Sequence, residues 1–336
     1  MTSLKDLAKT LDLSITQVSR ALDDKKDVSA ATKAKVRAAA LAMNYQPNAA
    51  ARSLRKQKAD TIAVVLPAGA NHIGLSALLS MLFDVAAALA RHGFDLIIIP
   101  GRPDADELDA LKRIVEGRRA DALVVVRTYR DDPRVAFLTA RGVPFVTSGR
   151  TSCGIVHAYV DGDGEAGFYA ATEVLAKLGH TRIAHIAGLS TFNFAGLRRQ
   201  GWAKAMQQHD LPITGLENEA SPDERGGERA ATELLSRKKR PTALLCATDA
   251  IAIGAITAAK KLGLTPGRDV SIIGHDGVAA GLLTTPTLST MEIAASDYGW
   301  RIADKLIRRL GGADVNDLTE ILPIRQIPRA SHGPPV

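Results

Sequence analysis

Short apolar runs alternate with helix-length segments along most of this chain, and the alternation occurs in two consecutive series. The runs expected as buried strands are Ile62–Leu66, Leu96–Ile99, Leu123–Val126 and Pro144–Thr147, then Ile183–Ile186, Ala243–Ala247 and Ser271–Gly274. Helical patterns fall near 75–91, 105–116 and 131–141, then near 163–179, 195–209, 224–238 and 249–262. Strands that alternate with helices predict parallel sheets covered on both faces. We therefore expect an α/β fold class with two similar subdomains.

The residues before this alternation carry most of the positive charge. Residues 1–60 contain 12 Lys and Arg against 6 Asp and Glu, a balance of +6, whereas the whole chain of 336 residues is only +7. Charge concentrated at one small end is typical of a nucleic-acid contact. The alternative is a solvated basic face without a partner. Charge alone does not distinguish the two, so the pattern of residues is needed.

Three short helices are expected in this basic segment. Ser3 and Ser14 are placed as N-caps of the first two helices, and a third helix begins at Ser29. Apolar residues recur at helical spacing on the expected inward faces, namely Leu4, Leu7, Ala8 and Leu11, then Val18, Ala21 and Leu22, then Val36, Ala40 and Met43. Two short helices joined by a tight turn and braced by a third predict a helix-turn-helix.

In a helix-turn-helix the start of the second helix reaches the base edges in the major groove. The outward residues there are Ile15, Thr16, Gln17, Ser19 and Arg20. Gln17 can form a bidentate pair with adenine, Thr16 can contact a thymine methyl, and Arg20 can read guanine or bind phosphate. A polar helix face that is merely solvated is the alternative.

A connector follows the three helices. Pro47 ends the third helix, and Asn48 can cap a new helix over residues 49–56. A helix of this length is unstable alone in water and needs a partner, either its twin in a dimer or DNA. Its one large apolar residue, Leu54, lies between Arg52 and Arg55, and a leucine wedged into a minor-groove base step can kink DNA. A flexible linker is the alternative.

These segments resemble the head and hinge of the lactose/galactose repressor (LacI/GalR) family. The matching stretches are Ser3-Leu-Lys-Asp-Leu-Ala8, Val18-Ser-Arg20, Asp27-Val-Ser29, Asn44-Tyr-Gln-Pro-Asn48 and Ala51-Arg-Ser-Leu54, with Leu178-Gly-His180 and Gly274-His-Asp276 as later landmarks. The resemblance implies a helix-turn-helix head (1–46), a hinge helix and linker (47–60) and a core like that of the periplasmic binding proteins. It also implies crossovers near 160, 290 and 322, which give an N-terminal core subdomain (61–160 plus 291–321) and a C-terminal one (161–290 plus 322–336).

The resemblance also assigns the DNA contacts. The base-reading residues would be Ile15, Thr16, Gln17 and Arg20, and the hinge pair would be Ala51 and Leu54. The contacts that position the DNA backbone would be Lys5, Ser19, Ser29, Thr32, Tyr45 and Asn48.

Polar residues at the carboxyl ends of the expected strands predict a ligand cleft, because open α/β sheets bind ligands at that edge. The candidates are Ser148, Arg150, Phe192, Phe194, Arg198, Thr248, Asp249 and Asp276. A carboxylate and a guanidinium suit a polyol, and the two phenylalanines could stack on a sugar ring. A structural ion pair for Arg198 and ordinary core packing for the phenylalanines are the alternatives.

The resemblance implies that Arg198 and Asp276 line an effector cleft. Where family members that bind purines or phosphates tend to place a second arginine, this chain has Phe192, and where many have an aromatic residue it has Ala220. The loss of a cation favours a neutral sugar or sugar derivative. Three residues after the first strand would close the cleft from the other side, namely Ala68, Asn71 and His72.

Together these features predict a cytoplasmic, sugar-controlled transcriptional repressor that binds pseudo-palindromic operator DNA as a homodimer. The expected dimer face is the helix 75–91, at Leu78, Leu79 and Leu82. The short, proline-rich tail after Ile324 has no leucine heptads, which favours a dimer over a tetramer. The rival hypothesis is a cytoplasmic sugar-binding protein without specific DNA function.

Other classes of protein lack support in the sequence. The longest apolar runs are strand-length, the N-terminus has no apolar h-region, and two distant cysteines, Cys153 and Cys246, fit reduced thiols, so we expect no membrane partner and no export. We find no phosphate loop, metal cluster or nucleophile elbow, so we expect no enzyme, cofactor or metal. Asp161 and Asp163 resemble part of a calcium loop but are expected to cap the helix from Gly164.

Overall fold

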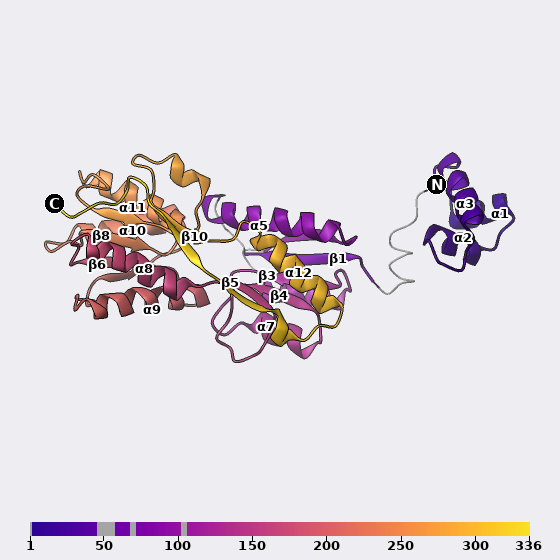
Figure 1. Cartoon of the computed structure of the whole chain (residues 1–336), viewed down its shortest axis with the longest axis horizontal. Helices are drawn as coiled ribbons and strands as arrows, with labels where there is room; N and C mark the ends of the chain where they lie inside the picture. The colour runs from indigo at the N-terminus through magenta and orange to yellow at the C-terminus, as the bar shows by residue number, and fades with distance from the viewer. Residues whose placement is uncertain (1, 46–57, 68–71, 102–105) are drawn as a thin grey trace. The chain divides into compact units, whose positions relative to one another are not determined.

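A computed structural model of the chain describes residues 2–45, 58–67, 72–101 and 106–336 (Figure 1). The chain divides into two compact units, with the boundary between Ala59 and Asp60. The N-terminal unit is the head and the C-terminal unit is the core. The connector helix predicted over 49–56 lies outside the described residues.

The head consists of three helices whose starts are capped by the predicted serines. They are α1 (Leu4–Leu11), α2 (Ile15–Leu22) and α3 (Ala30–Ala42). Ser3 and Asp6 form a reciprocal capping box on α1, Ser14 and Gln17 form another on α2, and Ser29 caps α3. Leu7, Val18 and Val36 are fully buried, one from each helix, so the three helices share one small core.

The first sheet of the core has the strand order β11-β5-β4-β3-β1-β2 and is parallel throughout. Its strands are β1 (Thr61–Leu66), β2 (Asp95–Pro100), β3 (Ala122–Val125), β4 (Phe145–Ser148), β5 (Tyr159–Gly162) and β11 (Thr319–Leu322). Helices cover both faces, α5 (His72–Ala90) and α12 (Tyr298–Leu310) on one and α6 (Glu107–Glu116) and α7 (Pro133–Ala140) on the other (Figure 1). Alternate residues of β1 point to the two faces.

The second sheet of the core has the order β7-β6-β8-β9 and is also parallel. Its strands are β6 (Ile183–Ala187), β7 (Glu217–Glu219), β8 (Ala243–Cys246) and β9 (Ser271–Ile273). Its helices are α8 (Gly164–Lys177), α9 (Asn193–Gln208), α10 (Glu224–Leu235) and α11 (Asp249–Lys261). At Gly201 a Cβ atom would lie 2.0 Å from the Glu165 carbonyl oxygen, so glycine allows α8 and α9 to pack closely.

Three segments connect the two sheets. Strand β5 of the first sheet leads directly into α8 of the second, and β11 leads into β12 (Ile324–Ile327). Strand β12 pairs antiparallel with β10 (Thr290–Ile293), which precedes α12. These segments lie together where the half of the core that contains the first sheet meets the half that contains the second (Figure 1). A ligand held between the sheets therefore lies beside all three connections.

The predicted α/β fold class is confirmed, and three details differ from the prediction. The prediction did not include α12 or the strands β5, β7, β10, β11 and β12. Of the three residues predicted for the dimer face on α5, Leu82 is only 1% exposed, so it does not lie at an exposed edge, whereas Leu78 and Leu79 are half-buried. Among the described side chains of this helix, Phe83 is a large one that is exposed, at 73%. Asp163 caps α8 as predicted, whereas Asp161 does not.

Candidate functional site

The start of α2 presents the predicted base-reading side chains to solvent. Ile15 is 48% exposed, and Thr16, Gln17 and Arg20 are also exposed. Two of them are engaged within the head: Gln17 Oε1 accepts from the Ser14 amide at 3.0 Å, and Arg20 forms an ion pair with Asp27. Since these contacts are solvent-exposed, exchanging them for DNA contacts costs little.

The predicted backbone-positioning residues are spread over the head. Lys5 is exposed, Ser29 Oγ contacts Thr32 Oγ1 at 2.8 Å, and Tyr45 is half-buried against the head core. Ser19 is only 6% exposed, so its side chain lies mainly inside the head. Three further candidates lie outside the described residues, namely Asn48, Ala51 and Leu54.

The core contains a cavity of about 600 Å³ between its two sheets. This volume is within the ordinary range for sites of small molecules. The first sheet and its helices contribute Ser76, Asp84, Arg127, Thr128 and Ser148, and the second contributes Phe192, Phe194, Arg198, Thr248, His275 and Asp276. The connecting segments add Asp161, Glu292 and Tyr298.

Asp276 and Arg198 form the polar centre of the cavity. Arg198 Nη2 lies 4.0 Å from Asp276 Oδ1, and the same guanidinium donates to the Ala247 carbonyl. Burial lowers the pKa of Arg198, and the nearby Asp276 opposes this effect. Asp276 has a φ of 120°, a strained conformation for a residue with a side chain, and such strain is frequent at ligand sites.

Carboxylates outnumber guanidiniums among the side chains that line the cavity. Among its described lining residues are four carboxylates, Asp84, Asp161, Asp276 and Glu292, and two guanidiniums, Arg127 and Arg198. Burial raises the pKa of Asp161, which pairs with Arg150 at 3.4 Å. Glu292 is likewise paired with Arg325, so the charges in and around the cavity nearly balance, and the cavity suits a neutral ligand that offers hydroxyl donors.

The aromatic residues of the cavity are stacked on one another. The Phe192 ring lies 5.4 Å from Tyr129 and 5.5 Å from Phe194, nearly parallel to both. The Arg198 guanidinium lies 4.6 Å from the centre of the Phe194 ring. Both phenylalanines line the cavity as expected, but neighbours lie against the ring faces that were expected to stack on a sugar.

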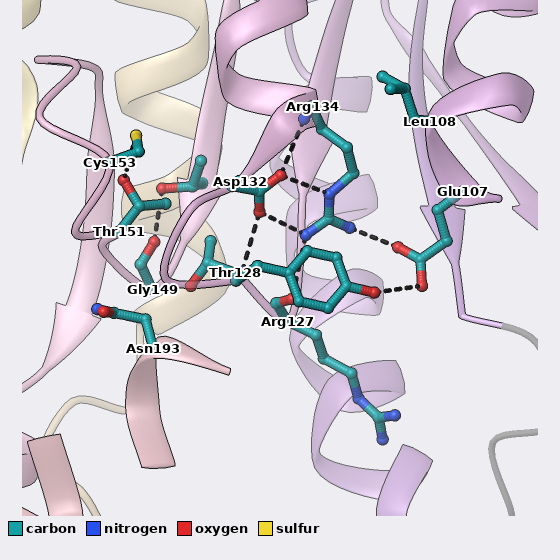
Figure 2. A network of polar contacts seen from close by, with 12 residues as sticks. Glu107, Leu108, Arg127, Thr128, Asp132, Arg134, Gly149, Thr151, Cys153 and Asn193 are labelled. Carbon is teal, nitrogen blue, oxygen red and sulfur yellow. Dashed lines mark hydrogen bonds and ion pairs between the residues drawn. The ribbon is translucent and has the colours of Figure 1, made fainter. Parts of the chain in front are cut away.

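A buried ionic cluster fixes the loop that carries Arg127 and Thr128 (Figure 2). Arg134, 2% exposed, bonds both carboxylate oxygens of Asp132 at 2.9 and 2.7 Å and Glu107 at 2.5 Å. Its Nη2 also donates to the Arg127 carbonyl at 3.1 Å. Figure 2 shows the Arg127 side chain extending away from this cluster. Arg127 therefore has a fixed backbone and a side chain on the cavity wall.

Asn193, at the start of α9, joins the two sheets beside the cavity. Its backbone N–H donates to Thr128 O at 3.0 Å and its side-chain amide to Arg150 O at 2.9 Å, while its oxygen accepts from Ser152 at 2.7 Å. We call Asn193 with these three residues the clasp. Asn193 is 4% exposed, so its own side chain is shielded from water, whereas Ser152 at the edge of the clasp is exposed.

Two predicted effector residues do not line the cavity. Asp249 is fully buried, where it accepts from the Val278 amide at 2.8 Å and from Thr290 Oγ1 at 2.6 Å. Arg150 is engaged with Asp161, behind the wall. Ala68 and Asn71 lie outside the described residues, and of His72 only its place at the start of α5 is described. Ala220 is buried in the core.

Several cavity residues were missed in the sequence. Arg127 and Thr128 follow the expected strand 123–126, so the rule that found Ser148 could have found them. Asp161 was interpreted only as a cap or metal ligand. Glu292 and Tyr298 belong to β10 and α12, which were not predicted.

Within the described residues, no group of three or more histidine, cysteine or acidic side chains could hold a metal ion. No helix in the same part of the chain is long and apolar enough to span a membrane.

A helix-turn-helix head joined to a two-sheet core with a ligand-sized cavity defines a class of ligand-responsive DNA-binding proteins. Residues 3–48 match the family described as bacterial regulatory proteins, lacI family, and residues 172–332 match a periplasmic binding protein-like domain. The chain is 35% identical to the transcriptional regulator RafR of Escherichia coli over 94% of each chain. It is 34% identical to AglR of Rhizobium meliloti, over 99% of this chain and 94% of AglR.

Solved structures agree with this comparison. The lac repressor dimer bound to operator and the anti-inducer ONPF has a TM-score of 0.85 and 25% identity, over 98% of both chains. The complex of the regulator CelR with cellobiose has a TM-score of 0.75 and 26% identity, over 98% of this chain and all of that one. The chain therefore belongs to the LacI family and is a DNA-binding transcriptional regulator, not an enzyme.

Proposed function

We propose that this regulator is a cytoplasmic repressor of carbohydrate-utilisation genes, and that a neutral sugar in the core cavity controls its affinity for operator DNA. The observation that carries the proposal is the pairing of Asp276 and Arg198 at the centre of the cavity. A carboxylate accepts from two sugar hydroxyls and a guanidinium donates to others. The cellobiose bound by the structural relative CelR supports the choice of ligand class.

The sugar contacts that we propose are lining residues of the cavity with polar side chains. We propose that Asp276, Arg198, Thr248, Ser148 and Arg127 bind its hydroxyl groups. Phe192 and Phe194 shape the wall through their ring edges, since their faces are occupied. Asp249 and Arg150 support the wall from behind.

In the head, we propose that Ile15, Thr16, Gln17 and Arg20 read bases, and that Lys5, Ser29, Thr32 and Tyr45 bind the DNA backbone with Asn48. Ser19, which is buried, would act by supporting α2. Ala51 and Leu54 would contact the minor groove, where an inserted leucine bends DNA. A homodimer would place two heads on the two halves of a pseudo-palindromic operator. The operator-bound dimer of the lac repressor supports this arrangement.

The test is a thermal-shift screen with glucose, galactose, cellobiose, melibiose and raffinose. A sugar that binds the folded state raises the melting temperature by mass action. We expect at least one sugar to do so, and Asp276→Ala to abolish the shift while operator affinity in a mobility-shift assay remains within about threefold. A shift of undiminished size in Asp276→Ala would show that the cavity is not the sugar site.

A further inference from the structure

His275 lies next to the strained Asp276 and contacts its carboxylate directly. His275 Nδ1 lies 2.9 Å from Asp276 Oδ1, and the histidine is only 3% exposed. A carboxylate accepts hydrogen bonds and does not donate them, so Nδ1 must carry the proton in this contact. The opposite nitrogen, Nε2, is buried without a hydrogen-bond partner among the described residues.

The surroundings of His275 keep its ring neutral and fixed. Its ring stacks on Phe168, with centroids 5.9 Å apart and an interplanar angle of 29°. Burial lowers the pKa of His275, and the nearby positive Arg198 lowers it further. A neutral ring with its proton on Nδ1 leaves Nε2 as an acceptor, which is the atom the structure buries without a partner.

The backbone at this point is also held in place. The Asp249 amide donates to the His275 carbonyl at 2.6 Å, and the Asp276 amide donates to the Met291 carbonyl at 2.8 Å. At Gly274 a Cβ atom would lie 2.2 Å from Asp249 Oδ1, so only glycine fits before the histidine. The backbone is thus fixed from α11 and from β10, but these contacts do not set the direction of the Asp276 carboxylate. Its Oδ1 lies at hydrogen-bond distance from His275 Nδ1, 2.9 Å, whereas Arg198 Nη2 is farther from the same oxygen, 4.0 Å.

We propose that His275 is a positioning residue for sugar recognition: its Nδ1–H holds one oxygen of Asp276, which leaves the other oxygen aimed at the sugar hydroxyls. This inference rests on the proposed function of the cavity. The alternative is an ordinary core histidine whose loss changes stability and not sugar affinity.

Two substitutions of similar polarity separate these roles. The amide nitrogen of His275→Asn is near the position of Nδ1, whereas that of His275→Gln is near the position of Nε2. Asn can therefore restore the bond to Asp276, and Gln cannot. Sugar affinity would be measured by calorimetry with cellobiose. If another sugar gives the largest thermal shift in the screen, that sugar would be used instead.

We expect His275→Asn to keep affinity within about threefold and His275→Gln to weaken it about tenfold or more, as for a lost hydrogen bond to a charged group. His185→Phe is the matched control. His185 is fully buried and packs on the same Phe168 at 5.4 Å, but its Nδ1 donates to the Leu245 carbonyl. This control should lower the melting temperature and leave sugar affinity within about twofold.

A readout without sugar tests the same contact. Long-range proton–nitrogen NMR at pH 7 should show the His275 ring neutral with its proton on Nδ1, the signal being assigned by its loss in His275→Asn. A proton on Nε2, or equal affinities for the Asn and Gln variants, would overturn the proposal. Unchanged sugar affinity in Asp276→Ala would instead refute the proposed cavity, so the two failures are distinguishable.

Discussion

Single residues in this cavity differ in whether they contact the ligand or support those that do. Asp276 and Asp249 are both acids at the ends of neighbouring strands, and sequence alone gives them the same role. The structure separates them, because Asp276 lines the cavity whereas the carboxylate of Asp249 is occupied by Thr290 and Val278. Asp249 therefore supports the cavity wall and does not contact the ligand. Its burial should affect how the stability of the protein depends on pH.

Asp249 should make stability depend on pH. Burial, reinforced by the negative Asp276, raises the pKa of Asp249 to about 7 from an ordinary 3.8, while hydrogen bonds from Thr290 and Val278 and the charge of Arg329 oppose this. The folded state then holds a proton that the unfolded state releases, so this contribution to stability is present at low pH. It is lost as pH rises from about 4 to about 7.

The measurement is the free energy of unfolding of the wild type and Asp249→Asn from pH 4 to 8. Because asparagine cannot ionise, we expect the difference between the two proteins to shift in favour of the variant as pH rises. A difference that does not change with pH would show that Asp249 does not titrate in this interval. The control is Asp314→Asn. Asp314 lies on the surface, and its pKa is lowered and not raised.

At the scale of elements, the clasp ties the start of α9 to the loops that follow β3 and β4. The stack of Tyr129 on Phe192 crosses the same boundary. These contacts hold the cavity walls contributed by the two sheets in one relative position. A sugar that binds both walls depends on that position.

We expect Asn193→Ala to weaken sugar binding although Asn193 is not a proposed sugar contact. The change removes two side-chain hydrogen bonds between the sheets, each worth about 1 kcal/mol, which corresponds to a loss of affinity of roughly fivefold to thirtyfold. Asn218→Ala is the control, because the Asn218 amide bonds Glu233 on the surface. The measurement is the sugar affinity of both variants by calorimetry, with the sugar identified by thermal shift. Equal affinities in the two variants would contradict a role for the clasp.

The elements themselves were predictable where local signals are strong. The serine caps fixed the starts of α1, α2 and α3, and short apolar runs revealed β3 and β8, which are buried throughout. Strand β12 was missed because Ile324–Ile327 is partly exposed and pairs only with distant β10. Helix α12 was missed although its buried residues, including Ile302 and Leu306, recur at helical spacing.

The same reasoning explains which cavity residues were found. A side chain at the carboxyl end of a strand, such as Ser148 at the end of β4, lies at the predicted edge. Tyr298, in contrast, reaches the cavity from a helix 150 residues farther along the chain, where its hydroxyl contacts Ser148 at 3.0 Å. Only the three-dimensional path of the chain brings these two residues together.

For the whole molecule, the proposed mechanism joins two binding events in one chain. In this proposal the core binds the sugar, the head binds the operator, and the predicted hinge transmits the effect of one on the other. If the sugar changes operator affinity by some factor, thermodynamic linkage requires the operator to change sugar affinity by the same factor. Coupling of this kind typically amounts to about 5- to 150-fold.

We expect this equality to hold for the full-length protein. Operator affinity would be measured by fluorescence anisotropy with and without saturating sugar, and sugar affinity by calorimetry with and without saturating operator, at one salt concentration because DNA binding depends strongly on salt. A duplex of scrambled sequence is the control and should leave sugar affinity unchanged. Leu54→Ala should reduce both factors together, since the proposed contact of Leu54 with the minor groove belongs to the hinge that joins head and core. The expectation fails if the sugar alters operator affinity but the operator does not alter sugar affinity. That result would show that the sugar acts on operator binding from a site other than the one measured by calorimetry.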